Sequence, residues 1–152
     1  MAYRIILFLL LNFAALAIGG ISTSKGVVSE WYAGLNKAPW TPPGWVFGFA
    51  WTSIMICFSI YLAMLWPNVE NKNVFIALYV LQWCLNVAWN PVFFNLQFLK
   101  VALLLIVSLT CLIAYYQFSF WSVLKIKSIF IAPYFIWLLI ATSLNTYIVL
   151  KN

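Results

Sequence analysis

Amide and aromatic side chains recur at helical spacing inside an apolar stretch in the middle of the chain. They are Gln82, Asn86, Trp89, Asn90 and Phe93, separated by four, three, one and three positions. Residues three or four apart share one face of an α-helix. An amide is costly against lipid, so we expect this face to point inward, toward a partner helix or a ligand.

Two further apolar stretches carry rows of the same kind. The residues are Trp51 and Met55 in one stretch, and Trp137, Ala141, Leu144 and Asn145 in the other. A cavity lined by three tryptophan rings and a few amides would suit a flat, apolar ligand with polar edges. The alternative is that the amides join helices and the tryptophans form a belt at the membrane surface.

The chain offers little for acid–base or metal chemistry. It has no histidine, which removes the commonest metal ligand and the usual general base at neutral pH. Its two carboxylates, Glu30 and Glu70, lie outside the apolar runs, and Cys57, Cys84 and Cys111 form no CxxC pair. The sequence therefore predicts no metal site, no cofactor and no catalytic pair. Any catalysis would have to use tryptophans as redox-active side chains.

The composition is that of a membrane protein. Of the 152 residues, 66% are hydrophobic and 7% are charged, and the mean hydropathy is +1.04. A soluble globule could not cover itself with so little polar surface. The eight basic residues lie at or between the ends of apolar runs, where interfacial anchors belong, and do not form the basic patch of a nucleic-acid-binding protein.

Five apolar runs are long enough to cross a membrane as helices. They cover residues 5–21, 46–66, 74–94, 101–120 and 129–150. The fold class is thus an all-α membrane protein, a single domain over residues 1–152 with its termini on opposite sides. For the first run a cleavable signal peptide is an alternative, but the run is long for one. Membrane orientation stays open, because each side carries four basic residues.

The longest connection, residues 22–44, leads into the aromatic stretch Trp31–Trp51. This stretch, WYAGLNKAPWTPPGWVFGFAW, holds three of the six prolines and four of the nine tryptophans. Proline fixes φ and biases the preceding residue toward extended backbone, which indicates a stiff loop. We expect it to form a lid over a cavity between helices, with Trp31, Trp40 and Trp45 as interfacial anchors.

This stretch resembles the signature of the tryptophan-rich sensory protein family, also called the translocator protein or peripheral-type benzodiazepine receptor family (TspO/MBR). LQWCLNVAWNPVFF (81–94) is similar to the family's third-helix pattern, an Asn three before a Trp and then Phe-Phe. PYFIWLLIATSLN (133–145) is similar to its fifth-helix pattern. The three motifs stand in the family's order, and the likeness covers the whole chain.

The resemblance implies a five-helix bundle, commonly a homodimer, with a pocket closed by the first loop. It implies binding of porphyrins such as protoporphyrin IX, of sterols in some members, and of isoquinoline carboxamides and benzodiazepines. The positions that it assigns to the pocket are Tyr32, Pro42, Trp51, Asn86, Trp89, Phe93, Trp137, Ala141 and Leu144. Helical spacing adds Met55 and Asn90.

Three roles follow for such a protein. The first is a membrane receptor that senses, scavenges or transports tetrapyrroles. The second, reported for some bacterial members of the family, is light-dependent porphyrin breakdown, for which Trp51 and Trp137 are the candidate residues. The third is a passive carrier of tetrapyrrole or sterol; Leu144, Tyr147 and Lys151 fit a loose sterol pattern. The bacterial cell membrane is the expected location, with an outer or organellar membrane as alternatives.

Overall fold

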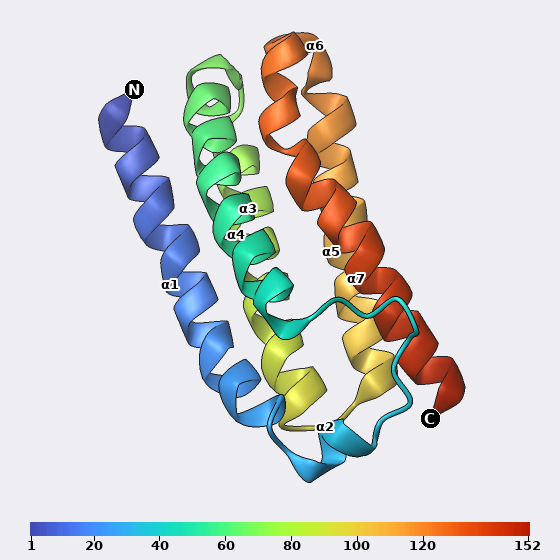
Figure 1. Ribbon diagram of the computed structural model, residues 1–152. Helices are drawn as coiled ribbons and strands as arrows, with labels where there is room; N and C mark the ends of the chain where they lie inside the picture. Colours follow the sequence, from blue (N-terminus) through green and yellow to red (C-terminus); the bar gives the residue numbers. More distant parts are fainter.

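A computed structural model describes all 152 residues as a bundle of five long helices joined by short helical turns and loops (Figure 1). The long helices are α1 (Ala2–Gly26), α3 (Gly44–Leu65), α4 (Lys72–Phe94), α5 (Leu99–Ser119) and α7 (Ala132–Lys151). The short elements are α2 (Glu30–Gly34), η1 (Trp66–Asn68), α6 (Trp121–Leu124) and η2 (Lys125–Phe130). All five long helices are long and apolar enough to cross a membrane, which confirms the predicted all-α, five-span class.

The helices form a ring in the order α3, α1, α4, α5 and α7. Helix α1 packs extensively on both α3 and α4, while α5 packs on α4 and α7. The contact that closes the ring, between α3 and α7, is much less extensive. The two termini lie at opposite ends of the bundle (Figure 1). One side of the ring is therefore a looser seam than the others.

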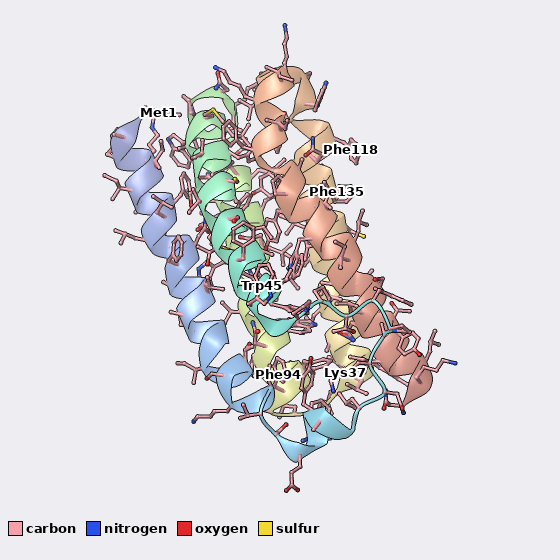
Figure 2. All side chains as sticks on the ribbon, viewed as in Figure 1. Met1, Lys37, Trp45, Phe94, Phe118 and Phe135 are labelled. Carbon is pink, nitrogen blue, oxygen red and sulfur yellow. The ribbon has the colours of Figure 1, made fainter.

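The core is rich in aromatic rings, and side chains fill the space between the helices (Figure 2). The ring of Phe58 meets the rings of Tyr134 and Tyr116 edge-to-face, with centroids 5.2 and 6.2 Å apart. The Tyr61 hydroxyl donates to the Tyr116 carbonyl at 2.9 Å. Edge-to-face ring contacts of this kind give the core of the bundle a defined packing.

Most helix ends differ from the predicted positions by one to five residues, and two of the differences have a local cause. Helix α1 continues five residues past 21, because the hydroxyls of Thr23 and Ser24 donate to carbonyls of the preceding turn and satisfy polar groups there. Helix α7 begins at Ala132, not at 129. The turn before it is 3₁₀ helix that begins at Lys125, where φ is 51°. Pro133 in the first turn of α7 loses no hydrogen bond.

The predicted lid connection, residues 22–44, is partly helical. After α1 ends, Ser29 caps α2, since its hydroxyl accepts from the Tyr32 backbone N–H at 3.2 Å. Residues 35–43 then run beside α7 before they enter α3 (Figure 1). The Asn152 side chain accepts from the Asn36 N–H at 2.9 Å, and the Trp40 indole N–H donates to Ser143 at 3.2 Å. The loop is thus fixed to α7 and crosses the α3–α7 seam.

The contact between α1 and α4 is close enough to require glycine. A Cβ added at Gly26 would lie 2.2 Å from the ring of Phe94, and one at Gly19 would lie 2.5 Å from the Asn90 amide nitrogen. Both distances are shorter than any normal contact. At Gly20, one residue further along, there is open space. Small residues that let helix backbones approach are typical of membrane bundles.

A buried hydrogen-bonded group reinforces the same side of the bundle. The Asn12 amide donates to the Ser59 hydroxyl at 2.8 Å, and the Tyr79 hydroxyl donates to the Asn12 carbonyl oxygen at 2.8 Å. One side chain of α1 therefore joins α3 and α4. In a bilayer core such groups have no water to bond to, so this pairing satisfies all three.

Charge is distributed evenly between the two ends. Each end carries four basic residues and one carboxylate. The basic residues at the N-terminal end are Arg4, Lys72, Lys125 and Lys127, and those at the other end are Lys25, Lys37, Lys100 and Lys151. The predicted balance therefore holds in the folded chain.

Candidate functional site

Helices α3, α4 and α7 converge on the side chain of Tyr134. Its hydroxyl oxygen accepts from the amides of Gln82, at 2.9 Å, and Asn86, at 3.1 Å. The indole of Trp51 meets the Tyr134 ring edge-to-face, with centroids 5.9 Å apart. Two residues predicted from spacing and from the resemblance, Trp51 and Asn86, are thus brought to one point from different helices.

A second group of rings lies nearer the lid. Trp89 stacks on Phe93 with centroids 4.9 Å apart and planes 17° from parallel, and its indole N–H donates to the Asn145 carbonyl oxygen at 3.1 Å. The ring of Tyr32, from α2, lies 6.4 Å from Phe93 and 5.6 Å from Phe94. Tyr32, Trp89 and Phe93 therefore form one group that joins the lid to α4 and, through Asn145, to α7.

Three buried polar atoms on the inward sides of α4 and α7 have no hydrogen-bond partner. They are the indole nitrogen of Trp137, the amide nitrogen of Asn145 and the amide oxygen of Gln82. Trp137 is only 7% exposed, and the ring of Phe47 meets its indole edge-to-face at 5.3 Å. Buried polar groups without partners are uncommon, and each has a net cost unless water or a ligand satisfies it.

A lysine lies over the lid ring. The Lys37 ammonium lies 4.5 Å from the centre of the Tyr32 ring and also donates to the Ala33 carbonyl oxygen at 3.5 Å. Partial burial raises the pKa of the Tyr32 hydroxyl above its usual value, because ionisation would place a charge away from water. The lid thus presents a neutral hydroxyl and a cation at the edge of the site.

Other predicted residues lie elsewhere. Asn90 faces α1, where its carbonyl oxygen accepts from Thr23 at 2.7 Å and its amide donates to the Asn86 carbonyl at 3.1 Å. Met55 is part of the main core and only 1% exposed. Pro42 is half-buried in the loop, while Ala141 packs against the core and Leu144 is buried along α7.

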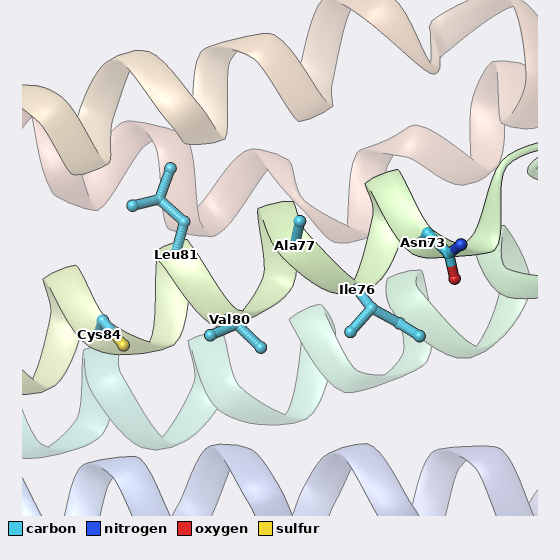
Figure 3. A pocket seen from close by; sticks show the side chains of 6 residues that line it. All are labelled: Asn73, Ile76, Ala77, Val80, Leu81 and Cys84. Atoms are coloured by element: carbon cyan, nitrogen blue, oxygen red, sulfur yellow. The ribbon is translucent and has the colours of Figure 1, made fainter.

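Two hollows lie on the outer surface, and none of the predicted site residues lines either one. One is a groove of about 620 Å³ between α1 and α4. The other is a shallow hollow of about 530 Å³ on the outer face of α4 (Figure 3). Both belong to the lipid-facing side of the bundle.

Sequence reasoning missed two residues that organise these contacts. Tyr134 is fully buried and receives both amides, and its only signal was its place beside Pro133 in the fifth-helix motif. In the sequence, Asn12 is a single polar break in the first apolar run, residues 5–21. A single amide in a long apolar helix is itself a signal for an inward-facing contact.

The chain is similar to known proteins over most of its length. The chain matches the TspO/MBR family over residues 7–150. It belongs to that family. It is 34% identical over 139 residues to the tryptophan-rich sensory protein of Cereibacter sphaeroides, covering 90% of this chain and 87% of the relative. It is 35% identical over 142 residues to the tryptophan-rich protein TspO of Archaeoglobus fulgidus, covering 91% and 92% respectively.

Similarity extends to animal members of the family. The human translocator protein is 34% identical over 125 residues, which cover 76% of this chain and 71% of that protein. The family resemblance stated from the motifs is therefore confirmed, and the chain is a multi-pass integral membrane protein. The names of these relatives support a membrane sensory or binding role.

Proposed function

We propose that this protein is a membrane receptor for tetrapyrroles, with metal-free protoporphyrin IX as the reference ligand. The ligand would lie between α3, α4 and α7, beneath the loop of residues 35–43. The observation that carries the proposal is the convergence of the three helices on Tyr134, through Trp51 and Asn86, beside the buried indole of Trp137.

Support comes first from ring chemistry. A porphyrin is a flat π-system, and flat ligands bind well between indole and phenyl faces. The stacked pair Trp89 and Phe93 and the edge-to-face pair Phe47 and Trp137 present such rings from α3, α4 and α7. These rings touch one another in the closed bundle, so entry of a ligand requires them to separate.

Support comes second from unused hydrogen-bonding capacity. The Trp137 N–H and the Asn145 amide are buried donors without partners, two turns apart on α7. Carbonyl, carboxylate and unprotonated pyrrole nitrogen groups are acceptors that could satisfy them. At the mouth, the Lys37 ammonium lies where it could meet a propionate carboxylate.

The residues favour a metal-free ring over haem. Histidine is the axial ligand of haem iron in globins and peroxidases, and the chain has no histidine. The same apolar, aromatic site could take sterols or drugs of the isoquinoline and benzodiazepine type. These ligands lack the charged edge that Lys37 would meet, so they serve as comparison ligands.

Two alternatives use the same site. Light-dependent porphyrin breakdown, with molecular oxygen as the oxidant, is favoured by the contact of Trp51 with Tyr134, since adjacent indole and phenol rings can pass an electron between them. A passive carrier would release the ligand on either side of the membrane. A homodimer in the membrane is compatible with each role, and native mass measurement would test it.

The test is a titration of the purified protein in detergent with protoporphyrin IX, first in darkness and then under light. Tryptophan quenching reports binding, and porphyrin absorbance reports loss of ligand. The test variant is Trp51→Phe combined with Trp137→Phe. The matched control is Trp45→Phe combined with Trp121→Phe, which changes two exposed indoles.

Saturable quenching that weakens at least tenfold in the test variant and stays unchanged in the control would support the receptor. An absence of saturable quenching in the wild type would reject it. Porphyrin loss in light that needs Trp51 and Trp137 would favour breakdown. Ligand flux into liposomes without loss would favour the carrier.

A further inference from the structure

The groove between α1 and α4 lies on the outside of the bundle, away from the proposed tetrapyrrole site. Its volume is about 620 Å³. The residues that line it are Tyr3, Arg4, Leu7, Phe8 and Leu11 from α1, Trp66 from η1, and Phe75, Ile76, Tyr79, Val80 and Trp83 from α4. All are apolar or aromatic except Arg4.

The groove has a rigid floor and an open rim. The floor is made of the buried rings of Phe8, Tyr79 and Phe75: Phe8 meets Tyr79 edge-to-face at 5.4 Å, and Phe75 meets the half-buried Trp66 at 5.3 Å. The rim residues Leu7 and Val80 are each 51% exposed. Val80 lies on the outer face of α4, where the groove meets the shallow hollow (Figure 3). The groove is therefore preformed and faces the lipid.

The polar groups of Tyr79 and Trp83, which line the groove along α4, are already satisfied within the protein. The Tyr79 hydroxyl donates inward to Asn12, and the Trp83 indole N–H donates to the Leu11 carbonyl oxygen at 3.0 Å. A ligand in the depth of the groove thus meets hydrocarbon and ring surface and no free hydrogen-bonding group. This surface suits a saturated chain better than a tetrapyrrole with polar edges.

A cation stands at the end of the groove that reaches the membrane surface. Arg4 lies in the first turns of α1, and its Nε donates to the Tyr3 hydroxyl at 2.9 Å. The two terminal guanidinium nitrogens make no hydrogen bond within the chain, and a guanidinium fork matches a phosphate oxygen pair. Lys72 lies 5.2 Å from the ring of Trp66 at the same end, and Glu70 is the only carboxylate there.

We propose that this groove binds one anionic phospholipid, with an acyl chain along the ring floor and the headgroup phosphate on Arg4. The chain segment from Arg4 to Leu11 spans about 10 Å at the usual helical rise, so the groove holds the upper part of one chain. Tyr3 and Trp66 are amphipathic rings of the kind that lie at the headgroup level.

Native mass spectrometry of the full chain tests the proposal. The protein is released from micelles that contain equal amounts of phosphatidylglycerol and phosphatidylcholine with the same acyl chains. We expect one retained lipid per chain and a preference for phosphatidylglycerol. Arg4→Gln should lower that preference roughly fivefold, the effect of one interfacial charge on an anionic lipid. Lys25→Gln removes the same charge from the other end of α1 and should change nothing.

A second pair of variants tests the groove itself. Leu7→Trp fills it and should remove both lipids, while Leu10→Trp, on an exposed position of α1 that does not line the groove, should not. Equal retention of the two lipids by the wild type would overturn the proposal, as would an unchanged preference in Arg4→Gln. A lipid-free dimer that Leu7→Trp splits would also overturn it, and would show that a second copy of the chain occupies the groove.

Discussion

The contact between α1 and α4 and the contact between α3 and α7 hold the bundle together in different ways. The α1–α4 seam is closed by backbone approach at Gly19 and Gly26 and by the buried bonds of Asn12. The α3–α7 seam has few direct contacts, mostly aromatic, and the loop of residues 35–43 crosses it. The α1–α4 contact is close-packed around the two glycines and hydrogen-bonded at Asn12, whereas the α3–α7 contact is covered by the loop.

This difference indicates where the bundle can open. Separation of α1 from α4 would expose amides to hydrocarbon and would lose tight packing, both of which are costly. Separation of α3 from α7 breaks mainly ring contacts and the hydrogen bonds of the loop. We therefore expect ligand entry at the α3–α7 seam, and the following variants test the comparison from the largest expected effect to the smallest.

Gly26→Ala should destabilise the bundle most. Its new Cβ would overlap the Phe94 ring, which is itself packed against Tyr32 and Phe93, at an expected cost of about 1–3 kcal/mol. Gly20→Ala is the matched control, because it has open space and gains helix propensity. Thermal denaturation in detergent measures both. Equal melting temperatures for the two variants would show that the α1–α4 seam is not closely packed.

Asn12→Ala should cost about 1 kcal/mol, since it leaves the hydroxyls of Tyr79 and Ser59 without their partner. Tyr79→Phe, which removes only the hydroxyl that α4 donates to Asn12, and the double variant complete a mutant cycle that isolates the coupling between α1 and α4. Denaturation in mixed micelles supplies the free energies. Strictly additive effects would mean that the bond adds nothing to the seam.

Trp40→Phe should loosen the loop without unfolding the bundle. The phenyl ring can still meet Tyr147, but the hydrogen bond to Ser143 is lost, so amide exchange in residues 35–43 should rise about fivefold. Trp45→Phe changes an exposed indole at the start of α3 and serves as the control. Hydrogen exchange read by mass spectrometry distinguishes the two variants. Identical exchange rates would show that the Trp40 hydrogen bond does not hold the loop over the α3–α7 contact.

Tyr32 gives the smallest effect, a loss of stability in alkaline solution. Because burial raises the pKa of its hydroxyl in the folded state, the protonated form is favoured by folding. The contribution is fully present below the ordinary pKa of 10.0 and falls as pH rises above it, because the unfolded chain ionises first. In Tyr32→Phe, the free energy of unfolding should fall less steeply as pH rises above 10.0. Denaturation at a series of pH values measures this slope, and equal slopes for the wild type and the variant would contradict the prediction.

Much of the fold could be predicted because apolar runs set the spans and the bilayer sets their length. The residues at which the helices begin and end were harder to predict. Hydropathy cannot show that the hydroxyls of Thr23 and Ser24 bond back to the helix and carry α1 past its apolar run. Helix α2 did carry a local signal, a Ser29 cap followed by Glu30, but five residues among prolines and glycines are easily taken for loop.

The site was predicted in part, because helical spacing gives a face but not the helix that it meets. Asn86 and Asn90 lie one turn apart, yet one bonds to Tyr134 on α7 and the other to Thr23 on α1. Which neighbour each asparagine contacts depends on the order of the five helices around the bundle, and the sequence of one helix does not determine that order. Tyr134 was missed because a tyrosine in an apolar run is not unusual by itself, and only the two amides make it a centre.

The even charge at the two ends has a consequence for biogenesis. With the same number of basic residues at each end, the loops give the insertion machinery no preferred topology, and an inverted copy would meet the same electrostatic terms. A single added or removed lysine would then decide which way the chain is threaded. Reporter fusions at the two termini, which must end in opposite compartments, would show how far the population divides.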